Sequence, residues 1–194
     1  MDINSIIQEE IEDYRSNQEF YHGTNKKFSR FDTSKVGTGQ EVEAHGFGFY
    51  FTSNKDIAEF YAKDLAGKNE PAYVYTVRVF NKDFFEWDDI VDHEKAERIL
   101  SCFKNLDGFD EVDINDMEDA LGLSDGYYGH YSQFSSIYDL LKAFLGSSRK
   151  ASEFFSDCGF DGIVFDSKES GYQVKNYTIF DSGNIKIIDV EKVN

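Results

Sequence analysis

The chain contains little cysteine, only Cys102 and Cys158 among 194 residues. The two residues form no CxxC pair and do not have a spacing typical of metal ligands. We therefore predict no metal site, and we expect both cysteines to be reduced side chains within helices of the core.

Basic residues are also scarce. The sequence has 20 Lys and Arg against 37 Asp and Glu, which gives a net charge of −17. A chain this acidic repels the phosphates of nucleic acids, so tight binding of DNA or RNA is not expected. The excess negative charge serves solubility, or it complements a basic protein target.

Long apolar runs are missing as well. No stretch approaches the roughly 20 residues that span a bilayer, so no membrane association is expected. Residues 1–14 carry charges throughout and lack the apolar core of a secretory signal. We predict a cytoplasmic protein. Delivery into the cytosol of a host or target cell by a non-classical route is the alternative.

Aromatic residues are plentiful, with 19 Phe and 12 Tyr, and 40% of the residues are hydrophobic. This composition and length are typical of one packed domain over residues 1–194. Residues 25–43 are expected to form a functional loop that Phe28 and Phe31 anchor. The spacing of apolar residues predicts helices over 2–15 and 54–66, the second capped by Thr52 or Ser53, and strands over 19–23, 46–52 and 72–80, the last of them half-buried.

From about residue 84 to 148 the spacing becomes helical, and we predict an acidic helical insert. Between Asp107 and Asp119 this insert has seven acidic residues and no basic one. The glycine and ligand spacing of an EF-hand loop are absent, so we interpret the stretch as a solvated surface. Helices are predicted over 90–103, 114–121 and 134–145, followed by strands over 162–165, 177–180 and 185–190, with a hairpin turn at 181–184 between the last two.

The order of these elements favours an α+β fold with antiparallel sheets and helices packed to the side. The GxGxxG segment of a dinucleotide-binding Rossmann fold is absent. Three other segments combine residues suited to a flat ligand: 21–24 (Tyr-His-Gly-Thr), 46–52 (Gly-Phe-Gly-Phe-Tyr-Phe-Thr) and 176–181 (Asn-Tyr-Thr-Ile-Phe-Asp). Tyr50 and Tyr61, about three helical turns apart, can converge on one ring. Taken singly, each segment is also typical of core packing.

Taken together, the segments resemble the H-Y-E class of ADP-ribosyltransferases, the diphtheria-toxin-like and poly(ADP-ribose)-polymerase-like enzymes. The segments are most similar to those of the small ADP-ribosyltransferase domains of phage and mobile-element polyproteins. Residues 159–163 also look like a framing motif of the phage-type members. The resemblance covers residues 19–80 and 151–190 and excludes the insert. It implies an ADP-ribosyltransferase-like split antiparallel β-sandwich with flanking helices, and NAD as the substrate.

The resemblance implies a role for each matching residue. His22 would hydrogen-bond a ribose hydroxyl on the adenosine side of NAD. The Gly23 backbone would pair with the nicotinamide carboxamide, where the lack of a Cβ permits close approach. Thr24 would support that loop, and Tyr50 and Tyr61 would stack on the two faces of the nicotinamide ring.

Asn176 stands where the family usually has a glutamate. It can accept the same hydrogen bond from the nicotinamide ribose but brings no charge. Three interpretations remain open. Asn176 serves a slower, mono-ADP-ribosylating enzyme, another carboxylate substitutes, or the protein binds NAD, or nothing, without catalysis. The candidate carboxylates are Glu41, Glu43, Asp166 and Glu169.

The function predicted from the sequence is therefore mono-ADP-ribosylation of a macromolecular target, expected to be a protein, with release of nicotinamide. One alternative is an NAD glycohydrolase, and another is a silent binding module that uses its acidic surface. His45 is expected to be a loop residue, with a substrate contact as the alternative. Residues 127–131, rich in tyrosine, are interpreted as packing or as a loop that docks the target.

Overall fold

The computed structural model describes residues 18–37, 44–68, 70–80, 83–124, 132–169 and 172–193. The helix expected over residues 2–15 and the segment 127–131 lie outside these ranges. The strands are β1 (Glu19–Thr24), β2 (Phe49–Thr52), β3 (Ala72–Val79), β4 (Phe84–Glu86), β5 (Gly162–Glu169), β6 (Tyr172–Ile179) and β7 (Ile185–Val193). The helices are α2 (Lys55–Ala66), α3 (His93–Lys104), α4 (Glu111–Ala120), α5 (Phe134–Leu145) and α6 (Ser148–Asp157), with short 3₁₀ turns η1 (Thr33–Lys35) and η2 (Ser182–Asn184).

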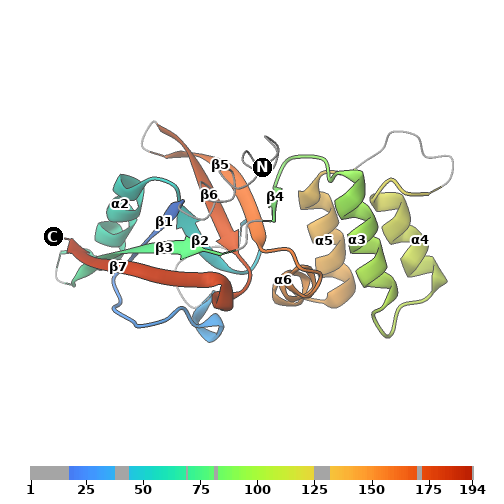
Figure 1. The fold of residues 1–194 in the computed structure, drawn as a ribbon, viewed down its shortest axis with the longest axis horizontal. Helices are drawn as coiled ribbons and strands as arrows, with labels where there is room; N and C mark the ends of the chain where they lie inside the picture. Colours follow the sequence, from blue (N-terminus) through green and yellow to red (C-terminus); the bar gives the residue numbers. More distant parts are fainter. Residues whose placement is uncertain are drawn as a thin grey trace, which may run out of the picture.

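The seven strands form one sheet in the order β4-β5-β6-β2-β1-β3-β7. All neighbours are antiparallel except β4 and β5, so the predicted α+β class is confirmed. The sheet has two groups of strands, which meet through a single register pair between Tyr21 of β1 and Thr52 of β2. Figure 1 shows α2 beside the β1–β3–β7 group and the other helices beyond the β4–β5 end.

The predicted hairpin between the last two strands is wrong. Asp181 does begin a turn, because its Oδ1 accepts the N–H of Gly183 at 2.9 Å. However, β6 already has β5 and β2 as neighbours, so both of its edges are occupied. Strand β7 therefore pairs with β3 on the far side of the sheet.

Strand β3 is buried on both faces, which corrects the prediction of a half-buried strand. On one face Val74 packs with Ala58 and Ala62 of α2. On the other face Tyr75 and Val77 belong to an aromatic core. Strand β3 has β1 and β7 as neighbours, and α2 covers one of its faces, so neither face of the strand is left to solvent.

Helix α2 begins after Asn54, which corrects the predicted cap at Thr52 or Ser53. The side chain of Asn54 accepts the N–H of Asp56 at 2.9 Å and that of Ile57 at 3.4 Å. Thr52 is still part of β2, so the chain leaves the sheet and enters the helix within a very short link. Such a side-chain oxygen satisfies donors that the first helical turn leaves unpaired.

Helices α3, α5 and α6 share a core with β4 and β5, in which Phe85 stacks on Phe134 at 4.0 Å between ring centres. Helix α5 has the predicted bounds. Strand β4 lies in the segment that we expected to be helical, because Phe85 enters this core beside β5. None of the helices in the described ranges is both long enough and apolar enough to cross a membrane.

The expectation that both cysteines are reduced is wrong. Cys102 of α3 and Cys158, which ends α6, form a disulfide with their Cα atoms 6.1 Å apart. The two residues are 56 positions apart in the sequence. Only the packing of α3 and α6 into one core brings them together, and no local spacing could indicate it.

Tyr138 connects the helices to the segment that precedes β2. Its hydroxyl donates to the carbonyl of Ser148 at 2.8 Å, accepts the N–H of Phe47 at 3.0 Å and lies 2.8 Å from Ser152 Oγ. Because these groups are buried, Tyr138→Phe is expected to lower the free energy of unfolding by about 1–3 kcal/mol. Urea denaturation measures this change. Tyr73→Phe, at a half-buried tyrosine of β3, is the control, and an equal loss in both variants would contradict the prediction.

Candidate functional site

The site lies where β1 and β2 separate. Beyond the register pair of Tyr21 and Thr52, the two strands are bridged by a side chain, because His22 Nδ1 lies 2.9 Å from the carbonyl oxygen of Tyr50. A carbonyl only accepts, so Nδ1 carries the hydrogen and donates it. In the neutral imidazole this leaves Nε2 as the acceptor.

Two pockets open on either side of this bridge, with volumes of about 710 and 310 Å³. Both sizes fall in the range of small-molecule sites. His22, Gly23 and Tyr50 line both pockets and therefore form the wall between them. A ligand with two parts could place one part in each pocket and bend over this wall.

The larger pocket is enclosed by the loop after β1. Phe28 stacks on Tyr75 at 4.2 Å, and the Tyr75 hydroxyl accepts the N–H of Phe28 at 2.6 Å and donates to its carbonyl at 2.9 Å. Phe31 is buried and packs on the ring of His22 at 5.5 Å. Phe28 and Phe31 thus anchor the loop, as predicted.

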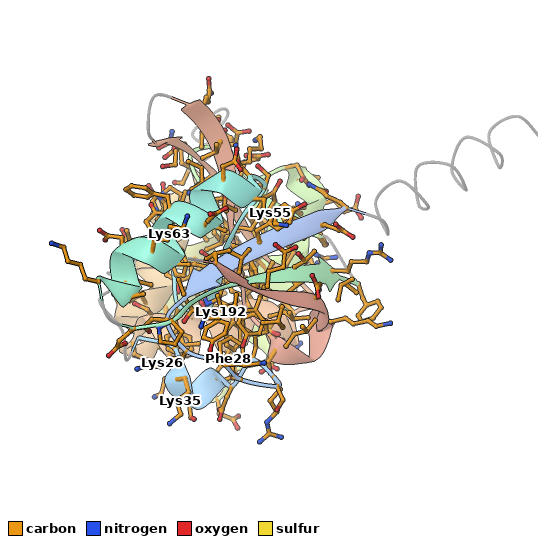
Figure 2. The ribbon with its side chains drawn as sticks, turned by 90° about the vertical axis from the view of Figure 1, so that its left-hand side faces the viewer. Lys26, Phe28, Lys35, Lys55, Lys63 and Lys192 are labelled. Atoms are coloured by element: carbon orange, nitrogen blue, oxygen red, sulfur yellow. A yellow bond between two sulfur atoms is a disulfide. The ribbon has the colours of Figure 1, made fainter. Side chains whose placement is uncertain are left out.

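The same loop gives the larger pocket a positive lining in an acidic chain. Lys26, Arg30 and Lys35 line it, and Asp32 is the one carboxylate among its described lining residues. Hydrogen bonds from Ser34 lower the pKa of Asp32, whose carboxylate caps η1. Figure 2 shows Lys26, Phe28 and Lys35 together on this loop, below α2. The pocket is therefore suited to an anionic group.

A row of register partners crosses four strands at the smaller pocket. Tyr21 of β1 pairs with Thr52 of β2, Thr52 pairs with Asn176 of β6, and Asn176 pairs with Phe165 of β5. All four residues line the pocket. Partners in antiparallel strands project from the same face of the sheet, so Asn176 lies between Thr52 and Phe165. Its side chain is almost fully buried, with 9% exposed.

Five of the six site residues predicted from the sequence come together at the smaller pocket. Thr24 lines only the larger pocket, and its Oγ1 accepts the N–H of Lys26 at 3.2 Å. The five residues are His22, Gly23, Tyr50, Tyr61 and Asn176.

Gly23 is tightly enclosed. A Cβ at this position would overlap the carbonyl oxygen of Ala58 and lie 2.8 Å from the backbone nitrogen of Ala62. The absence of a side chain therefore allows α2 to pack directly on β1. This close packing also brings α2, and with it Tyr61, to the pocket.

The two tyrosines are held differently. The Tyr50 hydroxyl donates to the carbonyl of Gly46 at 2.8 Å and accepts the N–H of His45 at 3.1 Å, so its ring has a defined position. Tyr61 lies on α2 with 42% of its surface exposed, next to the exposed Phe60. One wall of the pocket is thus anchored, while the other faces solvent.

His45 belongs to the pocket, although the sequence favoured a loop role for it. Its ring stacks on Phe165 with 3.7 Å between centres and 8° between planes, and meets the edge of Trp87 at 5.3 Å. Burial lowers the pKa of the imidazole, and the nearby charge of Asp88 opposes this shift. The sequence named Tyr21 and Thr52 only as members of their segments and missed Phe165 and Ser167, because the places of all four depend on the pairing of β1, β2, β6 and β5.

Of the four carboxylates considered as substitutes for a glutamate, Asp166 is the one whose side chain the structure describes, and it does not line this pocket. Asp166 follows Phe165 and projects from the opposite face of β5, where its carboxylate lies 3.8 Å from Lys175 Nζ. Residues 41 and 43 and the side chain of Glu169 lie outside the described part of the chain. Among its described lining residues, the smaller pocket has no carboxylate.

Within the described ranges, no group of three His, Cys, Asp or Glu side chains is arranged to hold a metal ion.

Comparison with known proteins gives one match. A family model described as "ADP-Ribosyltransferase in polyvalent proteins" matches residues 16–194. The match spans the helical segment that lay outside the resemblance seen in the sequence. No curated protein and no solved structure matches the chain.

Proposed function

Because the chain belongs to the ADP-ribosyltransferase domains of polyvalent proteins, we propose that it is an NAD-dependent mono-ADP-ribosyltransferase of the H-Y-E class. It modifies a protein target and releases nicotinamide. The observation that carries this proposal is the wall of His22, Gly23 and Tyr50 between two pockets of different chemistry. NAD has two matching parts, a flat cationic ring and an anionic adenosine diphosphate.

In this proposal the larger pocket holds the adenosine diphosphate. Lys26, Arg30 and Lys35 offset the charges of the pyrophosphate. His22 Nε2 accepts a hydrogen bond from a hydroxyl of the adenosine ribose, because Nδ1 is engaged with Tyr50. Thr24 supports the turn into the loop through its bond to Lys26.

The smaller pocket holds the nicotinamide ribose. The nicotinamide ring stacks between Tyr50 and Tyr61, and the Gly23 backbone pairs with its carboxamide. When the bond from the ribose anomeric carbon to the ring nitrogen breaks, nicotinamide leaves with the electron pair, and the ribose becomes oxocarbenium-like. A nucleophile of the target then attacks the anomeric carbon.

Asn176 accepts a hydrogen bond from the nicotinamide ribose in this arrangement. Its place between Thr52 and Phe165, in the row that lines the smaller pocket, supports this role. Because the amide is neutral, it stabilises the developing positive charge less than a carboxylate would. This favours transfer of single ADP-ribose units at a modest rate.

We further propose that residues 1–194 act as one domain, with about residues 84–148 as an acidic helical insert. The shared core of α3 and α5 with β4 and β5 supports this. The net charge of −17 supports a basic surface on the target.

Labelled NAD and a cell lysate test the transferase proposal. His22→Ala and Tyr50→Ala are each expected to reduce transfer of label to protein by about fivefold or more, since each removes a contact worth about 1 kcal/mol or more. Phe80→Ser, at an exposed residue that lines neither pocket, is the control and should transfer label as the wild type does.

The outcomes separate the alternatives. Release of nicotinamide without labelled protein identifies a glycohydrolase. No binding in a calorimetric titration with millimolar NAD identifies a silent binding module. Equal labelling by wild type and both pocket variants contradicts the transferase proposal.

A further inference from the structure

None of the described residues that line the smaller pocket is a carboxylate. A general base among them therefore has to be another kind of side chain. The titratable side chains among its described lining residues are two histidines and three tyrosines (His22, His45, Tyr21, Tyr50 and Tyr61). His22 donates from Nδ1 to the carbonyl of Tyr50, and the proposed function assigns its Nε2 to a hydroxyl of the adenosine ribose. A tyrosine hydroxyl is a far weaker base than a neutral imidazole. Among the described lining residues, His45 is the remaining group.

The position of His45 is defined on three sides. Phe165 covers one face of the ring, Trp87 meets it edge-on, and the His45 backbone N–H donates to the hydroxyl of Tyr50. Phe165 is also the register partner of Asn176. The imidazole therefore lies in the same pocket as the groups assigned to the nicotinamide ribose.

The surroundings of His45 favour its neutral form at pH 7. Burial against Phe165 and Trp87 disfavours the cation and lowers the pKa. The charged group that acts on it is Asp88, which partly opposes this shift, and the nearby titratable hydroxyl is that of Tyr50. A neutral imidazole has one nitrogen that can accept a proton.

We propose that His45 is the general base of the reaction and that the acceptor is a hydroxyl group. This inference rests on the proposed transferase function. As the acceptor oxygen forms its bond to the anomeric carbon, its proton moves to the imidazole. The bond from that carbon to nicotinamide breaks, and nicotinamide leaves as a neutral molecule with the electron pair. The positive charge of the nicotinamide ring is thus replaced by that of the imidazolium, which loses its proton to solvent.

The class of acceptor follows from this base. A hydroxyl needs to lose a proton as it attacks, and imidazole is a common base for that step. A guanidinium has no free lone pair until it has lost a proton, and its pKa above about 12 prevents imidazole from removing that proton before attack. A hydroxyl attacks with a lone pair that it already has. A carboxylate acceptor is already anionic and needs no base. The described lining of the pocket also offers no carboxylate to attract a cationic acceptor.

Small acceptors test the class directly. The purified full chain is incubated with NAD and either methanol, agmatine or acetate, and mass spectrometry identifies the products. The expected result is methyl ADP-riboside from methanol, with no adduct of agmatine or acetate. An agmatine or acetate adduct in place of the methyl product overturns the proposal.

The base is tested with His45→Ala. We expect methanolysis to fall by about 10², while the Kd for NAD, measured by calorimetry, changes by less than about threefold. Imidazole added to the buffer should restore part of the rate, because it can occupy the space over Phe165. His45→Phe keeps the stacking on Phe165 and should lose the same activity without rescue.

The pH profile distinguishes a base from a structural residue. For the wild type, kcat/KM should rise with pH and level off, with its midpoint below about 6.5, the usual pKa of histidine. This limb should disappear in His45→Ala. If the limb remains, it belongs to another group, and the proposal is overturned.

The two proposals fail in different ways. If His45 variants keep wild-type methanolysis while Tyr50→Ala loses it, His45 is not the base and the transferase proposal stands. If the wild type binds no NAD, both proposals are wrong.

Discussion

Asn176→Glu is expected to raise the rate of nicotinamide release by about 10²–10³, the usual effect of one electrostatic contact at a reacting centre. The described lining of the smaller pocket has no carboxylate, so the new charge would be the first among these residues to act on the oxocarbenium ion of the proposed reaction. Asn176 lies between Thr52 and Phe165 in the row that crosses the sheet, which supports its place beside the ribose. The low exposure of this site strengthens the interaction of a charge with a neighbouring cation.

Asn176→Gln is the matched control, because glutamine has the length of glutamate without its charge. The rate of nicotinamide release from NAD, measured by chromatography, should change little in Asn176→Gln. Circular dichroism and thermal unfolding of both variants establish that each is folded. Unchanged or lower activity of a folded Asn176→Glu would place Asn176 away from the reacting carbon.

Gly23→Ala is expected to lower the free energy of unfolding by about 3 kcal/mol, at the upper end of the cost of overpacking. The new Cβ would overlap the backbone of Ala58 and approach that of Ala62, both in the middle of α2. Backbone atoms inside a helix cannot turn aside as a side chain can, so the whole helix must move away from β1. Tyr61 moves with α2, and NAD affinity should fall together with stability.

Gly183→Ala is the control for this substitution. The atoms nearest to its Cβ would be those of the Asp181 carboxylate, the closest at 3.0 Å, and a side chain can move where backbone cannot. Urea denaturation should therefore show a change of a few tenths of a kcal/mol for Gly183→Ala, the usual size for such a surface position. A similar small change for Gly23→Ala would contradict the close packing of α2 on β1.

The helical part of the molecule supports the site through two consecutive links. Tyr138 of α5 holds the N–H of Phe47, and the carbonyl of Gly46 accepts the hydroxyl of Tyr50. A change in the packing of α5 and α6 would therefore shift the ring of Tyr50, which we propose stacks on nicotinamide. This connection gives a physical reason for finding the helices and the pocket within one family match.

Much of the secondary structure could be predicted from the sequence. The bounds of α5 were correct, and those of β1 and β3 were correct to within one residue at their ends. These elements follow from apolar spacing, which acts over a few neighbouring residues. The cap of α2 was misplaced, because Thr52, Ser53 and Asn54 all have suitable side chains and only the end of β2 decides among them.

By itself, the sequence determined the segments that carry the site. Tyr21 to Thr24, the run before Tyr50, Tyr61 and Asn176 were recognisable in it, because strands and helices present side chains at regular spacings. The resemblance to ADP-ribosyltransferases rested on these segments, and the family match supports it at the level of the family.

Only the tertiary structure decided how distant segments meet. The pairing of β6 with β2 and β5 places Asn176 beside Thr52 and Phe165, and the same register brings His45 over Phe165. The disulfide between Cys102 and Cys158 likewise depends on the packing of α3 with α6. These contacts join residues far apart in the chain. They are stabilised by apolar surface that distant segments bury together and by the register of paired strands, and no local pattern of residues encodes either.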